Sequence, residues 1–253
     1  MFKPKTERIE KLAKLFPEII LSMEKIFNGP TNIYIDWSNV IHWQDKLRWN
    51  FDLKRMKQFF DSFDTMRSIK IYTGTLEGNR QSEDFIPELK AMGYDVSTKP
   101  VKLMKMFIDV SSIPKDSPVI LKSFIKKSLL SKLDIATIEY LNNKLEAFNK
   151  QGILYIEEPK CNFDVEMGRD MLRDFDNDGV ENYILWSVDS DFAGPVNQIR
   201  NDGKNAVIFA TSGKVSTELD DTGTFVFDVK KIKEFICWSR DLSQSIKDKI
   251  NDL

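Results

Sequence analysis

Short apolar runs alternate with helical patterns along this 253-residue chain, and the alternation is the feature that most limits its fold. Runs at 32–36, 69–73 and 94–98 have the length and composition of buried strands. Helical periodicity follows the first two runs, at 53–63 and 82–92. Strands that alternate with helices of about 10 to 15 residues form parallel sheets covered by helices on both faces. The sequence therefore predicts an α/β fold.

The same rhythm returns in the second half of the chain. Residues 153–157, 183–188 and 206–210 are strand candidates, and residues 164–175 and 191–201 have helical patterns. We expect these strands to extend a central, mainly parallel sheet.

The two ends of the chain are predicted to be helical. In residues 1–30, apolar side chains recur every three or four positions, which indicates an amphipathic helix interrupted at Pro17. We expect a main domain at 31–228 and a C-terminal helix at 229–253. The N-terminal segment never reaches the roughly 18 consecutive apolar residues of a membrane span and has no secretion signal, so no membrane association and a cytoplasmic location are expected.

Composition excludes several classes of protein. Two cysteines and one histidine are too few for an ordinary zinc site or a disulfide scaffold. A net charge of −2 and an isoelectric point of about 5.7 exclude a uniformly basic nucleic-acid coat. Any basic surface must therefore be local.

One segment is strongly basic. Residues at about 100–150 do not fit the strand and helix rhythm and are predicted to be an insertion. Residues 99–132 carry eight lysines and two acidic residues, a charge of +6, which leaves −8 for the rest of the chain. Ser117 and Pro118 resemble the start of a helix, which we expect to continue through three lysines. These are Lys122, Lys126 and Lys127.

Aspartates gather where predicted strands end. Asp36 ends the first strand, Asp189 and Asp191 follow the strand at 183–188, and Asp164 opens the helix before that strand. The carboxyl edge of an open parallel sheet is where ligands bind. Clustered carboxylates repel one another unless they bind a cation or have raised pKa values, and oxygen ligands favour Mg²⁺ or Mn²⁺. We therefore expect a Mg²⁺ or Mn²⁺ site at this edge.

Three motifs carry a family resemblance. DWSN at 36–39, KCNFDVEMGRD at 160–170 and WSVDSDFAGPVNQIRNDGKNAVIFA at 186–210 together resemble the NYN domain, the LabA-like branch of the PIN-like nucleases, over about residues 31–228. The resemblance implies a PIN-like αβα sandwich and a metal-dependent ribonuclease whose acidic pocket binds Mg²⁺ or Mn²⁺. One departure is Val188, where the family commonly has glycine.

The resemblance also implies roles for individual residues. The catalytic and metal-binding acids correspond to four aspartates: Asp36, Asp164, Asp189 and Asp191. Asn39 matches the amide of the first motif and is expected to bind substrate. Asp170 matches a further acid, but a helix turns about 240° in six residues, so we expect Asp170 to support the site rather than bind the ion.

The function expected from these features is hydrolysis of RNA phosphodiester bonds by a metal-dependent endoribonuclease. RNA is the expected partner, and the lysines 122, 126 and 127 are its expected grip because an acidic pocket repels phosphate. A catalytically inactive RNA-binding or regulatory protein on the same fold is the alternative. A membrane-surface helix built on Ile120, Leu121, Phe124 and Ile125 is the other explanation of the insertion. The sequence leaves open whether the chain forms homo-oligomers.

Other features favour ordinary structural roles. Asp174, Asp176, Asp178 and Gly179 spell the start of a calcium loop, but Leu185 stands where its bidentate glutamate belongs, so the segment is predicted to be a turn. His42 is expected to pack, with substrate contact as the alternative. For Trp37, packing in the core and stacking on a base are equally expected. A phosphatase with an aspartyl nucleophile is disfavoured, because its DxDx[TV] motif is missing from the first strand.

Overall fold

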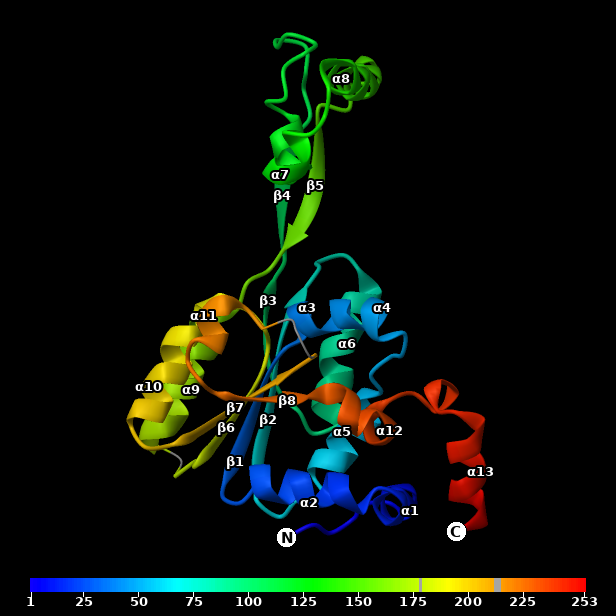
Figure 1. The fold of residues 1–253 in the computed structure, drawn as a ribbon, viewed down its shortest axis with the longest axis vertical. Coiled ribbons are helices and arrows are strands. Elements are labelled where there is room, and N and C mark those ends of the chain that lie inside the picture. The colour runs from blue at the N-terminus through cyan, green and yellow to red at the C-terminus, as the bar shows by residue number, and fades with distance from the viewer. Residues whose placement is uncertain (178, 212–214) are drawn as a thin grey trace. The chain divides into compact units, whose positions relative to one another are not determined.

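The computed structural model describes residues 1–177, 179–211 and 215–253 (Figure 1). The chain divides into two compact units. Unit 1 comprises residues 1–100 together with 161–253, and unit 2 comprises residues 101–160.

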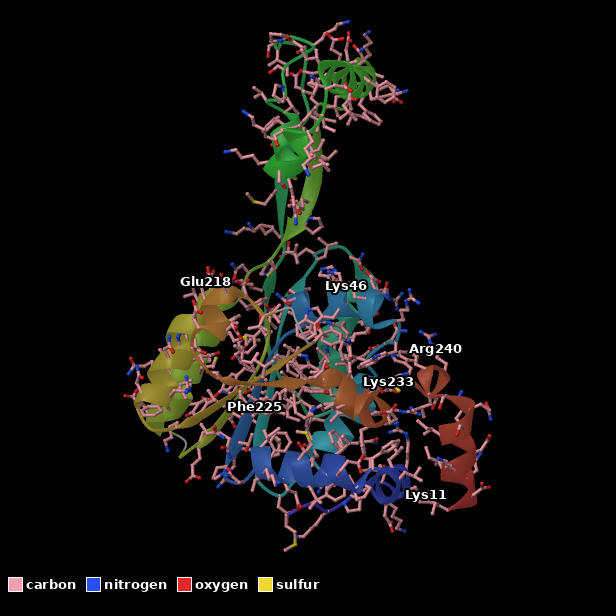
Figure 2. The ribbon with its side chains drawn as sticks, in the orientation of Figure 1. Lys11, Lys46, Glu218, Phe225, Lys233 and Arg240 are labelled. Atoms are coloured by element: carbon pink, nitrogen blue, oxygen red, sulfur yellow. The ribbon has the colours of Figure 1, made fainter. Side chains whose placement is uncertain are left out.

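The centre of unit 1 is a parallel sheet, which has six strands in the described residues. In spatial order they are β3 (Asp95–Pro100), β2 (Met66–Thr75), β1 (Thr31–Asp36), β6 (Asn182–Trp186), β7 (Asn205–Ala210) and β8 (Phe225–Asp228). Each neighbouring pair is parallel, so the predicted α/β class with a central parallel sheet is confirmed. The edge strand β8 exposes Phe225, labelled in Figure 2, and was not predicted.

Helices cover both faces of this sheet. Helices α9 (Asp164–Asn177) and α10 (Ala193–Asn201) lie on one face, whereas α5 (Leu53–Phe60), α6 (Arg80–Ala91) and α12 (Lys233–Ile236) lie on the other (Figure 1). The architecture is an αβα sandwich, as the PIN-like expectation requires.

Aromatic side chains fill the core between the sheet and α5. The Phe60 ring packs edge-on against Trp186 at 6.0 Å and also contacts Phe209 at 6.3 Å. All three side chains are fully buried, and Phe27 and Phe59 extend the cluster. This core fixes β6 and β7 under α5, and therefore fixes where β6 ends.

The N-terminal segment forms two helices that break at Pro17. They are α1 (Glu7–Leu15) and α2 (Pro17–Ile26), and Pro17 occupies the first position of α2, where its missing N–H costs nothing. Residues after β8 form short helices rather than one long helix, ending with α13 (Gln244–Asp252). The remaining α-helices of unit 1 are α3 (Trp37–Val40), α4 (Gln44–Leu47) and α11 (Thr217–Asp220).

Unit 2 is built differently. Its strands β4 (Lys102–Phe107) and β5 (Tyr155–Lys160) form an antiparallel ribbon. Its helices are the 3₁₀ turn η2 (Leu121–Ser123), α7 (Lys127–Leu130) and α8 (Ile135–Lys150). A small cluster of Leu121, Leu130 and Ile138 is its core.

Two expectations for this region are wrong. The strand expected at 153–157 belongs to the antiparallel ribbon as β5 and not to the central sheet, and every residue of β5 is exposed. The helix expected from Pro118 through Lys127 is split between η2 and α7, because Leu121 and Leu130 turn inward to the small core. Burial of Leu121 also removes the continuous apolar face that a membrane-surface helix would need. Within the described residues, no helix is both long enough and apolar enough to cross a membrane.

A candidate carboxylate site at the switch point of the sheet

The strand order of the sheet creates a crevice between β1 and β6. The chain builds β2 and β3 outward on one side of β1, whereas β7 and β8 extend the sheet beyond β6. Ligands of open α/β sheets bind at such a switch point, beyond the carboxyl ends of the strands. Asp36 ends β1, and Ser187 directly follows β6. The Ser187 hydroxyl lies 3.4 Å from the Asp36 carboxylate and links the two strand ends.

Asp36 is a buried acid at the centre of this edge. Its side chain is 8% exposed, and its Oδ1 accepts the backbone N–H of Asn39 at 3.2 Å, which caps α3. Burial, with smaller contributions from the nearby charges of Asp164 and Asp189, raises the pKa of Asp36 to about 6. Asp36 is therefore an acid whose charge is costly at neutral pH unless a cation is present.

Asp164 reaches the same edge from α9. It is the first residue of this helix, and its backbone N–H donates to the side chain of Asn162 at 2.8 Å. Burial raises the pKa of Asp164, and the charges of Asp189 and Asp191 add to this effect. Its Oδ2 is buried and has no hydrogen-bond partner among the described residues. An orphaned buried carboxylate oxygen is expensive, and a bound cation would satisfy it.

Asp189 and Asp191 stand on the turn between β6 and α10. Asp189 caps the short turn η3 (Ser190–Phe192), since its Oδ1 accepts the backbone N–H of Asp191 at 3.3 Å. The Asp189 N–H in turn donates to the Ser187 hydroxyl at 3.3 Å. Asp189 is half-buried and Asp191 is exposed. The turn therefore joins the Ser187 link to the two acids.

A ladder of acidic side chains holds α9 against the sheet and thereby positions Asp164. Glu166 pairs with Lys99 at 2.5 Å, and Asp170 accepts the Tyr72 hydroxyl at 3.1 Å. One turn further along, Asp174 pairs with Lys70 at 2.7 Å. These acids are four residues apart and therefore share one face of the helix. Because Lys99 is near the carboxyl end of β3 and Lys70 lies earlier along β2, α9 runs antiparallel to the strands, with Asp164 at their carboxyl edge.

Asp174, the last acid of this ladder, belongs to a buried hydrogen-bond network. Asp174 is 6% exposed and accepts hydrogen bonds from Tyr34 at 2.6 Å and from Asn32 at 2.8 Å, besides its pair with Lys70. Burial and the charge of Asp174 keep the Tyr34 hydroxyl protonated by raising its pKa. Asp174 is thus occupied within the core, and Asp178 of the same acidic run lies outside the described residues.

The other candidate residues have different surroundings. Asn39 positions Asp36 with its backbone N–H, and its side-chain oxygen accepts the indole N–H of Trp43 at 2.9 Å. Asp170 bonds to Tyr72 and to Arg169, its neighbour along α9, at 2.9 Å. The three lysines 122, 126 and 127 are exposed in unit 2.

The structure places two further residues that the sequence singled out, and the packing expected for His42 is wrong. Trp37 is 6% exposed and packs against Phe51 and Phe85, so it belongs to the core and is not free to stack on a base. His42 is exposed rather than packed, because η1 (Ile41–Trp43) turns its side chain outward.

Sequence reasoning missed three residues beside the site. Ser187 links Asp36 to the Asp189 turn, and its position directly after a buried strand was a usable signal. Lys99 and Glu166 form the ion pair nearest to Asp164 on the ladder, but they are 67 residues apart in sequence. Only the fold brings such a pair together.

The four aspartates have the oxygen donors that Mg²⁺ or Mn²⁺ prefers. The orphaned Asp164 oxygen and the raised pKa values of Asp36 and Asp164 fit a site that a cation completes. However, the described residues contain no group of three acidic, cysteine or histidine side chains already arranged to hold a metal. The donors therefore suit the ion chemically, and the side chains would have to converge on it.

Comparison with known proteins connects this chain to a family. Residues 105–230 match the family model described as "NYN domain", which confirms the resemblance drawn from the motifs. The matched range contains Asp164, Asp189 and Asp191 and begins after Asp36. The chain is 22% identical over 205 residues to the "Low amplitude and bright protein LabA" of Synechococcus elongatus, covering 81% of this chain and 86% of that protein.

One solved structure was matched to this chain. It is a protein of unknown function from Vibrio parahaemolyticus, 17% identical, with a TM-score of 0.48. The comparison covers 81% of this chain and 94% of that one.

Proposed function

We propose that this chain, whose residues 105–230 match the NYN domain model, is a metal-dependent endoribonuclease that hydrolyses RNA phosphodiester bonds at the switch point of its sheet. Its ion would be Mg²⁺ or Mn²⁺, held by Asp36, Asp164, Asp189 and Asp191. RNA is the proposed substrate, and activity, metal dependence and substrate class form one hypothesis.

The observation that carries this proposal is the burial of neighbouring carboxylates at one edge of the sheet. Burial raises the pKa of Asp36 and the pKa of Asp164. The charges of Asp164 and Asp189 add to the shift of Asp36, and those of Asp189 and Asp191 add to the shift of Asp164. Acids selected only for stability would be paired, as Glu166, Asp170 and Asp174 are on the same helix. Perturbed acids at a ligand-binding edge are typical of functional sites.

Each element of the site has a separate role in this proposal. The Asn39 N–H and the Ser187 hydroxyl orient the carboxylate of Asp36. The acid ladder on α9 orients Asp164, and the turn before α10 presents Asp189 and Asp191. A divalent ion bound by these carboxylates would supply an activated water and stabilise negative charge on the phosphate and the leaving oxygen.

The direct test is cleavage of a panel of structured and unstructured RNAs by the full-length protein with Mn²⁺, Mg²⁺ or EDTA. Since one bound ion is worth several kcal/mol of transition-state stabilisation, Asp164→Asn and Asp191→Asn are expected to lower cleavage by about a hundredfold or more. Asp202→Asn is the matched control, because Asp202 caps the opposite end of α10 and is exposed. Wild-type rates in Asp36→Asn, Asp164→Asn and Asp191→Asn alike would refute the assignment.

Two observations favour a second candidate, a catalytically inactive RNA-binding or regulatory protein on the same fold. No three potential ligands among the described residues already form a metal cage, and Asp191 is exposed. On this second hypothesis the protein binds RNA, leaves it intact with either ion, and its binding is unaffected by the aspartate substitutions. The same experiment therefore separates the two functions.

A further inference from the structure

Unit 2 contains a pocket remote in sequence from the carboxylate motifs. It lies between α8 and the segment 110–115 and has a volume of about 410 Å³. This volume is within the range of small-molecule sites, about 300 to 1,000 Å³. All its lining residues belong to unit 2, so the pocket does not depend on unit 1.

Asn142 on α8 lines this pocket with an unsatisfied acceptor. The residue is 2% exposed, and its Nδ2 donates to the backbone carbonyls of Lys115 at 2.6 Å and Ser117 at 2.8 Å. These two acceptors determine which end of the amide is nitrogen. The Oδ1 atom at the other end is buried and has no partner among the residues that the structure describes. A buried acceptor left without a donor is unfavourable, so a ligand N–H or O–H that reaches this atom from the pocket would stabilise the complex.

The neighbouring amide does not have this property. Asn149 is seven residues further along α8. Its side-chain oxygen accepts the N–H of Val110 at 2.9 Å, and its side-chain nitrogen donates to the carbonyls of Ile108 and Ile153. Both ends of its amide are used to hold the walls of the pocket. Of these two amides, Asn142 is therefore the one with an acceptor left for a ligand.

The rest of the lining limits the ligand further. Apolar side chains form part of the walls, namely Val110, Ile113, Pro114 and Leu154. The ammonium groups of Lys115 and Lys150 lie 3.9 and 3.0 Å, respectively, from the carboxylate of Glu146. Two positive charges against one negative charge favour an anionic ligand. A nucleotide combines these three features, since its base has a ring face and ring or amino N–H groups and its phosphate is negatively charged.

We infer that unit 2 holds a nucleotide-binding subsite, in which the base enters the pocket, donates an N–H to Asn142 Oδ1, and leaves its phosphate beside Lys115 and Lys150. The nucleotide is either a free nucleoside monophosphate or one residue of an RNA strand. The second source rests on the proposed function, whereas the first does not.

The test is methyl NMR of the full-length protein in EDTA, titrated with AMP, CMP, GMP, UMP or adenosine. At least one monophosphate is expected to shift the methyl signals of Ile113 and Leu154 and to leave Ile33, in the core of unit 1, unchanged. Adenosine is expected to bind more weakly than AMP because it lacks the phosphate. No shift of Ile113 or Leu154 at millimolar concentration of any monophosphate would overturn the inference.

Variants locate the site. Ser111 is exposed and lines the pocket, so Ser111→Phe is expected to fill it and abolish the shifts. Replacing both rim lysines (Lys115→Gln with Lys150→Gln) is expected to weaken monophosphate binding about fivefold or more and to leave adenosine binding unchanged. Lys144→Gln is the matched control, since Lys144 is an exposed lysine of α8 outside the pocket. Shifts that persist in Ser111→Phe would contradict the pocket assignment.

A ten-nucleotide RNA in EDTA separates the two sources. If the pocket serves RNA, the oligonucleotide shifts the same methyl signals, and Ser111→Phe weakens its affinity. If the pocket serves free nucleotides, monophosphates shift these signals and the oligonucleotide does not. Asp191→Asn is expected to bind as the wild type does in either case, so loss of cleavage and loss of the subsite are distinguishable.

Discussion

The two units of this chain are stabilised by cores of different size and composition. Unit 1 packs a parallel sheet between two helical layers around a large aromatic core, whereas unit 2 has a core cluster of three side chains and an exposed antiparallel ribbon. Their charges also differ. Residues 101–160 carry ten lysines and seven acidic residues, a net charge of +3, which leaves −5 for unit 1. The scaffold of the acidic site and the basic surface therefore belong to different compact units of one chain.

The largest effect should come from the core of unit 1. Phe60→Ala is expected to lower the free energy of unfolding by about 3 to 5 kcal/mol, because it empties a fully buried aromatic position. Leu130→Ala, in the small core of unit 2, should cost about 2 kcal/mol. All five tryptophans lie in unit 1, so tryptophan fluorescence during urea unfolding reports that unit alone. The fluorescence midpoint is expected to fall in Phe60→Ala and to stay unchanged in Leu130→Ala, and a fall in Leu130→Ala as well would show that the units unfold together.

A second prediction concerns the pH dependence of unit 1. Burial raises the folded-state pKa of Asp36 from 3.8 to about 6, so the folded protein binds this proton more tightly than the unfolded chain does. The resulting stabilisation is fully present below pH 3.8 and is lost as the pH rises through about 6. In EDTA at pH 7 to 8, Asp36→Asn should therefore be more stable than the wild type by up to about 3 kcal/mol.

The informative quantity is the difference in unfolding free energy between Asp36→Asn and the wild type, measured from pH 4 to pH 8. It should grow with pH, whereas Asp202→Asn should give a flat difference. A flat profile for Asp36→Asn as well would mean that Asp36 titrates normally, and the electrostatic argument for the site would fail.

The smallest effect is expected for the basic surface of unit 2. Replacing Lys122, Lys126 and Lys127 with glutamate should weaken RNA binding and reduce the logarithmic salt dependence by about 0.7 for each lost phosphate contact on a single strand. Three exposed lysines of unit 1, namely Lys5, Lys54 and Lys230, replaced with glutamate provide a control of equal charge change. If both triple variants lose the same slope, the lysines of unit 2 contribute only net charge and are not a specific grip.

Sequence patterns predicted unit 1 better than unit 2, and the reason is burial. Every residue of β1 is buried, so its run of apolar residues correctly predicted a strand in the core of the sheet. In β5 every residue is exposed, so the pattern identified a strand without identifying its partner. The 16-residue helix α8 was missed because it buries few side chains, among them the polar Asn142, and therefore has weak periodicity.

The candidate site was predictable in part for a similar reason. Asp36 and Asp189 follow buried strands, so topology alone assigns them to one edge of the sheet. The ladder from Glu166 to Asp174 was not predictable, because its partners Lys99, Tyr72 and Lys70 are distant in sequence and meet α9 only in the folded chain. The position of Asp164 depends on those contacts.

The central claim is that the carboxylates at the switch point bind a divalent cation, and calorimetric titration of the full-length protein with Mn²⁺ at neutral pH tests it most directly. The wild type should bind Mn²⁺, and its melting temperature should rise in millimolar Mn²⁺ because the ion binds the folded cluster. Asp36→Asn and Asp164→Asn should bind at least about tenfold more weakly, with Asp202→Asn unchanged. A wild type that neither binds millimolar Mn²⁺ nor gains thermal stability, or binding that survives both substitutions, would contradict the account.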